Sequence, residues 1–136
     1  ALETQQNSDT TYRLYDYDRK DAEGKLRELH LKKSIEVIEV PSIPERHTVH
    51  HEQIEDLLTT TLIECAYFSV GKWNLSGSAS LKQQKPFLLI SVIEGEGRMI
   101  SGEYVYPFKK GDHMLLPYGL GEFKLEGYAE CIVSHL

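Results

Sequence analysis

Beyond residue 60, most of the chain consists of short runs in which apolar and polar residues alternate, a pattern typical of half-buried β-strands. Glycines separate these runs, and no run here has the period of a helix. The predicted strands are Leu62–Phe68, Trp73–Leu81, Phe87–Ile93, Arg98–Ile100, Tyr104–Phe108, His113–Leu116, Glu122–Leu125 and Ala129–Val133. Short strands at this spacing predict an all-β sandwich or small barrel.

Two glycine-containing segments are predicted to be turns between these strands. Residues 94–97 alternate Glu and Gly and are expected to join two strands tightly. Gly111 and Asp112 are expected to form a second turn, which starts the strand that runs toward Pro117.

The N-terminal part of the chain has a different pattern. Alternation predicts strands at residues 2–6 and 11–17, separated by a turn at residues 7–9, and we expect a hairpin. The second of these strands would place Arg13, Tyr15 and Tyr17 on one face.

The period changes between residues 21 and 40. Leu31, Ile35 and Ile38 recur at helical spacing and predict a short amphipathic helix, which Pro41 would end. The prolines at 41 and 44 and the polar stretch His47–Glu52 are typical of an exposed linker. We therefore place a boundary between two units near residue 45.

Composition narrows the possible partners of this chain. Its 136 residues are 40% hydrophobic and 26% charged, which is typical of a globular domain. The net charge of −6 and the lack of a basic cluster longer than two residues argue against nucleic acid. No apolar run approaches the ~18 residues of a membrane span.

Cysteines and histidines give no metal-binding pattern. Cys65 and Cys131 each lie in an apolar strand-like run and are expected to be buried thiols of a cytoplasmic protein. His47, His50 and His51 form the only histidine cluster, and we expect them to be solvated in the linker. The other histidines are expected to be structural: His113 on the barrel surface or in the core, and His30 and His135 without partners.

Two segments resemble the two sequence signatures of the cupin family. They are the run Ser91–Gly97 and the segment in which Gly111, Pro117 and Gly119 recur. This resemblance implies a double-stranded β-helix, or jelly-roll barrel. Metal-binding cupins carry a His pair, a Glu and a further His in these signatures. At the corresponding positions this chain has Lys82, Gln84, Leu88 and Glu122. We therefore expect residues 45–136 to form a cupin-like barrel without a metal.

A sharper resemblance lies in residues 5–19, which contain an Asn-Ser-Asp-x-x-x-Arg core ending at Arg13. This stretch closely resembles the class I mannose-6-phosphate isomerases, in their short bacterial form, and the similarity continues through Leu29–Leu31 and Pro107–His113 to the end of the chain. Members of this family look like two tandem cupin barrels, of which the first holds zinc and interconverts mannose 6-phosphate and fructose 6-phosphate. The resemblance implies that residues 1–20 are the last strands of the catalytic barrel, 21–44 a helix and linker, and 45–136 the metal-free barrel.

One catalytic residue is implied by this resemblance, namely Arg13. Aldose–ketose isomerisation passes through an enediolate, whose developing negative oxygens a guanidinium can stabilise without losing its own proton. Arg13 could equally bind the substrate phosphate, or it could form only an ion pair with Asp9, Asp16 or Asp18. Tyr15 and Tyr17 are expected to belong to the core rather than to the site.

The first residues have no initiator Met and follow the pattern of a strand interior, so we expect the chain to be a fragment. The family's zinc ligands would then lie outside it, and the chain alone would be inactive. Its expected partners are a hexose 6-phosphate and the N-terminal half of the same enzyme. The predicted strands at residues 2–6 and 11–17 would have unpaired edges in an isolated monomer, so we expect binding to that N-terminal half, self-association, or disorder near the N-terminus.

Two other functions stay open. Residues 45–136 could be a metal-free sugar-binding module, with a pocket lined by Trp73, Tyr104, Tyr106 and Tyr118. Alternatively, this barrel could only cover apolar surface of a catalytic barrel, assisted by the helix face of Leu31, Ile35 and Ile38.

Overall fold

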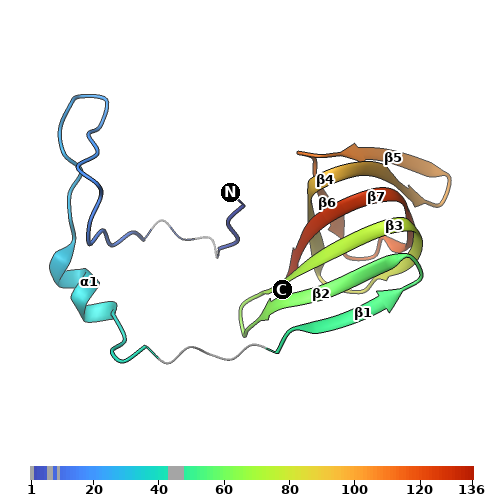
Figure 1. Cartoon of the computed structure of the whole chain (residues 1–136), viewed down its shortest axis with the longest axis horizontal. Coiled ribbons are helices and arrows are strands. Elements are labelled where there is room, and N and C mark those ends of the chain that lie inside the picture. Colours follow the sequence, from blue (N-terminus) through green and yellow to red (C-terminus); the bar gives the residue numbers. More distant parts are fainter. Residues whose placement is uncertain (1, 6–7, 9, 43–47) are drawn as a thin grey trace. The chain divides into compact units, whose positions relative to one another are not determined.

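The computed structural model describes residues 2–5, 8, 10–42 and 48–136. Within these residues it contains helix α1 (Leu31–Val37) and seven strands, which are β1 (His50–Ile54), β2 (Leu57–Glu64), β3 (Ser69–Gln83), β4 (Phe87–Ser101), β5 (Tyr104–Lys109), β6 (His113–Pro117) and β7 (Gly121–His135) (Figure 1). The chain divides into two compact units: residues 5–45, which contain α1, and residues 1–4 with 46–136, which contain all seven strands.

The seven strands form one antiparallel sheet in the order β1-β2-β3-β7-β4-β5. Strand β6 pairs with the first part of β4, and β5 pairs with the last part of the same edge. Leu57 on β2 and Phe108 on β5 come from distant positions in this order, yet both belong to one buried cluster. The sheet therefore curls around a common interior, as Figure 1 shows, and the predicted β-rich barrel is confirmed.

The predicted turn at residues 94–97 is wrong, because β4 runs through it as one strand of 15 residues. The pairing of β4 with β7 shifts between Val92 and Glu94, which marks a β-bulge. Before the bulge, Ile90 and Val92 face the core, and after it the inward set moves to odd numbers such as Met99. Gly95 has φ +80° there, a backbone conformation that glycine adopts without strain.

A glycine inside a strand also explains why two separate strands were wrongly predicted on either side of Gly127. Glu122–Leu125 and Ala129–Val133 were expected to be separate strands around Gly127, but they belong to one strand, β7. Gly127 pairs with Gly77 on β3 and with Gly97 on β4, so three glycines form a row across neighbouring strands. A Cβ atom at Gly97 would lie 2.7 Å from the ring of Phe108 and even closer to the carbonyl of Glu126. The glycines therefore permit close approach within the sheet instead of ending strands.

The predicted linker at His47–Glu52 is also wrong in part. His50, His51 and Glu52 begin β1, where they pair with β2 opposite Thr61, Thr60 and Thr59. Strand β1 is at the edge of the sheet and its first four residues are exposed, so no apolar alternation marks it. His47 lies outside the described residues.

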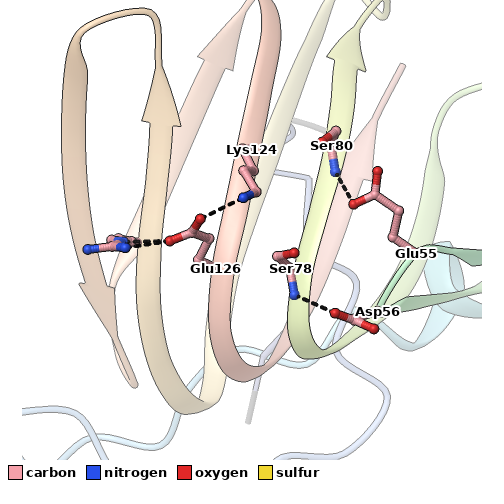
Figure 2. Close-up of polar contacts among 7 residues, drawn as sticks. Glu55, Asp56, Ser78, Ser80, Lys124 and Glu126 are labelled. Carbon is pink, nitrogen blue, oxygen red and sulfur yellow. Dashed lines mark hydrogen bonds and ion pairs between the residues drawn. The ribbon is translucent and has the colours of Figure 1, made fainter.

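Two acidic residues at the β1–β2 turn extend the sheet's hydrogen bonding (Figure 2). Asp56 accepts a hydrogen bond from the Ser78 amide at 2.9 Å, and Glu55 accepts one from the Ser80 amide at 3.2 Å. These amides lie on β3 beyond Leu75, where its pairing with β2 ends. The carboxylates thus satisfy backbone donors that would otherwise form an open sheet edge.

The predicted hairpin of strands 2–6 and 11–17 is wrong: residues 2–5 and 11–17 form no strand, and residues 6, 7 and 9 lie outside the described part of the chain. The chain instead folds back at Asp21–Lys25, where Asp21 accepts hydrogen bonds from the amides of Glu23 and Lys25.

Helix α1 is confirmed, but its apolar residues are not its buried ones. Leu31, Ile35 and Ile38 are 52%, 68% and 48% exposed, whereas Ser34 is buried. The helix is only seven residues long and ends at Val37, and the C-cap residue Ile38 has an extended backbone conformation.

Candidate functional site

Arg13 is half-buried in an irregular segment of the first unit. Its backbone N–H donates a hydrogen bond to Nδ1 of His30 at 3.2 Å, and its carbonyl accepts one from the His30 N–H at 2.7 Å. Arg13 is therefore held by a residue 17 positions later in the chain, so the expectation that His30 has no partner is wrong.

A buried carboxylate lies near this arginine. Asp16 is 8% exposed and forms ion pairs with Arg19, at 2.6 Å, and with Arg27, at 3.4 Å. The hydrogen bond from Arg19 lowers the pKa of Asp16 from its ordinary value most, and the positive charges of Arg19, Arg27 and Arg13 lower it further, against an opposing effect of burial. Asp16 is therefore ionised at neutral pH among three guanidinium groups.

The ion pairs of Asp16 bear on the structural alternative for Arg13. Within the described residues, Asp16 pairs with Arg19 and Arg27, and Arg13 acts on it only through longer-range charge. Asp9 lies outside the described residues. In this arrangement Arg19 and Arg27 neutralise Asp16, and the Arg13 guanidinium can bind an anionic substrate.

Tyr15 and Tyr17 lie in the same segment and contact each other. Their ring centroids are 5.0 Å apart in an edge arrangement, and the side chains are 63% and 79% exposed. The expectation that they belong to the core is wrong in this chain.

The sheet lines a partly open cavity of about 350 Å³ between the β1–β2–β3 side and strands β4 and β7. Trp73 lines it, as the sugar-binding alternative requires. The other three aromatic residues of that alternative do not: Tyr104, Tyr106 and Tyr118 are 70%, 47% and 77% exposed and lie outside the cavity lining. The alternative is thus corrected to a pocket in which Trp73 alone of the four takes part.

Three of the four positions that correspond to cupin metal ligands line this same cavity, namely Lys82, Gln84 and Leu88. None of these side chains is a carboxylate, imidazole or thiolate, so the residues present do not fit a transition metal. Within the described part of the chain, no group of three or more His, Cys, Asp or Glu side chains is arranged to hold a metal ion.

Gln83 was not predicted to matter, yet it shapes the cavity. It is 4% exposed, donates to the Leu116 carbonyl at 2.8 Å and accepts from the Lys85 amide at 3.1 Å. No local sequence signal identifies it, because its partner Leu116 is 33 positions away.

Two further histidines contact hydroxyl groups, and the two cysteines differ in burial. The ring of His51 contacts the Thr60 hydroxyl at 3.0 Å, and that of His113, which is exposed, contacts the Ser91 hydroxyl at 2.9 Å. Cys131 is buried, and burial raises the pKa of its thiol to about 11. Cys65 is only half-buried, contrary to expectation, and its thiol lies 3.4 Å from the Phe68 carbonyl.

The family model of the mannose-6-phosphate isomerase cupin domain matches residues 58–136 of this chain. The chain belongs to this family. The matched residues include nearly all of β2 and all of β3 to β7, with the glycine row and most of the cavity lining, whereas Glu52 and Ile54 of β1 line the cavity from outside the match. Arg13 and α1 lie before the matched residues.

Comparisons with individual proteins extend the similarity to the N-terminal unit. The chain is 44% identical to a mannose-6-phosphate isomerase of Streptococcus mutans over 98% of its own length and 42% of that protein's length. It is 43% identical to a probable mannose-6-phosphate isomerase, GmuF, of Bacillus subtilis over 99% of its length and 43% of that protein's. The chain therefore spans about two fifths of the curated relatives it matches.

Solved structures agree with this assignment. A crystal structure of the mannose 6-phosphate isomerase from Bacillus subtilis superposes with a TM-score of 0.92 and 41% identity, over 96% of this chain and 41% of that one. Streptomyces PAC13, solved with uridine, has a TM-score of 0.59 at 11% identity and covers 68% of this chain and 81% of that one, which shows a shared fold alone. No helix in the described residues is long and apolar enough to cross a membrane.

Proposed function

We propose that this isomerase cupin chain acts as the C-terminal portion of a zinc-dependent mannose-6-phosphate isomerase. The observation that supports this most directly is the sequence identity of 43–44% to a mannose-6-phosphate isomerase and a probable mannose-6-phosphate isomerase, over 98–99% of this chain. The proposed reaction is the interconversion of mannose 6-phosphate and fructose 6-phosphate through an enediolate, in the cytoplasm. The two free cysteines are in keeping with a reducing compartment.

In this proposal Arg13 stabilises the negative charge that develops on the substrate oxygens as a proton moves between C1 and C2. A guanidinium suits this role because it stays protonated and offers donors in a rigid plane. The ionised Asp16 nearby is paired to Arg19 and Arg27, so its charge is balanced by these two side chains.

Zinc would have to come from another part of the enzyme. The described residues hold no metal-ligand cluster, and the cupin positions at Lys82, Gln84 and Leu88 do not fit one. We therefore propose that the N-terminal half of the enzyme carries the zinc ligands and that residues 1–136 alone are inactive.

Substitution of Arg13 in the full-length gene product tests its role. We expect Arg13→Ala to lower kcat about 10²- to 10³-fold with little change in KM, because the lost charge stabilisation exists mainly in the transition state. Steady-state kinetics with mannose 6-phosphate measure both constants. A rise in KM at constant kcat would assign Arg13 to the substrate phosphate instead.

Arg98→Gln is the matched control, since it removes an exposed arginine of the sheet and should leave both constants unchanged. Wild-type kinetics in Arg13→Ala would contradict the proposed site.

A second measurement compares zinc content and turnover of residues 1–136 with those of the full-length gene product. Stoichiometric zinc in residues 1–136 would contradict the proposed division of ligands.

A second candidate function, sugar binding by the cupin unit, is favoured by the cavity beside Trp73. Trp73 is the only tryptophan in the sequence, so its fluorescence reports on this cavity. Titration of residues 1–136 with fructose 6-phosphate should then give a saturable change that inorganic phosphate does not reproduce. No change at millimolar sugar phosphate would exclude this function.

A further inference from the structure

His30 and Arg13 are connected by hydrogen bonds in both directions. The His30 amide donates to the Arg13 carbonyl at 2.7 Å, and the Arg13 amide donates to Nδ1 of the His30 ring at 3.2 Å. The first bond uses only backbone atoms and would form with almost any residue at position 30. The second requires a side-chain acceptor at this place, which is the contribution of the imidazole.

The imidazole of His30 is not used for the helix that it precedes. His30 is the N-cap of α1, and its carbonyl accepts the first helical bond from the Ser34 amide at 2.8 Å. Its side chain makes no capping bond to the helix, although this is the usual reason for a polar residue at an N-cap. The ring acceptor is thus directed to Arg13.

Neighbouring groups hold the ring in place. Tyr12 packs against His30 in an edge arrangement with ring centroids 6.3 Å apart. The ammonium of Lys33 lies 5.8 Å from the centre of the Tyr12 ring. Tyr12 and the Arg13 backbone thus contact the imidazole itself, and Lys33 lies against Tyr12.

Further contacts connect the segment that follows Arg13 with the segment that precedes His30. Asp16, three residues after Arg13, pairs with Arg27, three residues before His30. Farther from Arg13, the backbones of Lys20 and Leu26 form an isolated antiparallel β-bridge. The Asp21 amide donates a hydrogen bond to the Lys25 carbonyl at 2.9 Å. Two arms of the chain are thus connected along their length, with Arg13 and His30 at the base.

We propose that His30 is a positioning residue for Arg13: its Nδ1 atom fixes the backbone from which the Arg13 guanidinium reaches the substrate. This inference rests on the proposed catalytic role of Arg13. A fixed backbone matters because a displacement of about 1 Å of a catalytic group can lower a rate about 10²-fold.

Two substitutions in the full-length gene product separate the acceptor from the ring. Asn places a side-chain oxygen close to where Nδ1 lies, whereas Ala has no acceptor. We expect His30→Ala to lower kcat at least tenfold with KM nearly unchanged, and His30→Asn to stay within about threefold of the wild type.

Amide hydrogen exchange of residues 1–136 gives a readout that does not depend on activity. The Arg13 amide should exchange at least tenfold faster in His30→Ala and at nearly the wild-type rate in His30→Asn. His113→Ala, which removes a ring bonded to Ser91 on the sheet, is the control and should leave Arg13 unchanged.

The outcomes distinguish the two proposals. If Arg13→Ala is fully active, the proposed catalytic role fails whatever His30 does. If Arg13→Ala is inactive but His30→Ala matches the wild type in kcat or in Arg13 exchange, the positioning role is overturned. Equal losses in His30→Ala and His30→Asn would also overturn it, because the acceptor would then not be the feature that matters.

Discussion

Gly97 shows how a single residue position is decided by its neighbours across the sheet. It lies opposite Gly127, and the Phe108 ring occupies the space above it that a side chain would need. Its φ is not positive, so the requirement for glycine comes from close contacts and not from backbone conformation. The same residue type at Gly102, in the β4–β5 turn, has no atom near its missing Cβ.

Gly97→Ala should therefore destabilise the fold by about 2–3 kcal/mol, because the new methyl group meets Phe108 and the Glu126 carbonyl. The free energy of unfolding from urea denaturation measures this. Gly102→Ala is the control, and it should lose about 1 kcal/mol from its positive φ alone. Equal losses in the two variants would contradict the argument from close contact.

At the scale of elements, β4 and β7 are joined by an ionic cluster on their exposed side (Figure 2). Glu126 on β7 bonds Arg98 on β4 at 2.6 Å and Lys124 on its own strand at 2.7 Å. The hydrogen bonds from Lys124 and Arg98 lower the pKa of Glu126 below its ordinary value.

A lowered carboxylate pKa stabilises the folded state above the pKa of the unfolded chain, and this contribution is lost as pH falls through the lower folded value. Glu126→Gln should therefore lose less unfolding free energy than the wild type when pH falls below about 5. Urea denaturation at several pH values measures the difference. Glu103→Gln, in the β4–β5 turn and outside this cluster, is the control substitution. An unchanged pH dependence in Glu126→Gln would contradict the role of the cluster.

At the scale of the whole sheet, stability depends on which face of each strand turns inward. Leu115 and Leu116 are neighbours on β6, but Leu115 is 63% exposed and Leu116 is 1% exposed. Leu116 pairs with the buried Leu88 of β4, whereas Leu115 pairs with Leu89 on the outer face. The two leucines form a matched pair that differs only in burial.

Leu116→Ala should lower the free energy of unfolding by about 3 kcal/mol through lost burial and a cavity beside Leu88. Leu115→Ala should change it by less than about 0.5 kcal/mol. Thermal or urea denaturation of both variants tests this. A similar loss in both would mean that the barrel interior is not the face assigned here.

Several features of the cupin unit were predictable because they are local. Alternation identifies Trp73–Leu81, Tyr104–Phe108 and His113–Leu116, all of which lie within strands of the structure. The turn at Gly111 and Asp112 is confirmed, with the Asp112 amide bonded to the Lys109 carbonyl at 3.0 Å. Helical spacing likewise predicts α1, and the motif at Arg13 indicates the family.

Other features depended on partners that the sequence pattern does not identify. Gly95 and Gly127 look like turn residues, but β4 and β7 pair on both sides of them, so each strand continues. His50 and His51 look like linker residues, and they form a strand because β2 provides backbone partners. The candidate site follows the same rule, since nothing near position 13 in the sequence indicates His30.

The sequence by itself determined the β-rich class, the short helix and the family, because period and motif are properties of neighbouring residues. Only the tertiary structure decided where strands end, where the cavity lies and that His30 holds Arg13. These features arise from hydrogen bonds and close contacts between residues far apart in the chain, and local periodicity carries no record of such pairings.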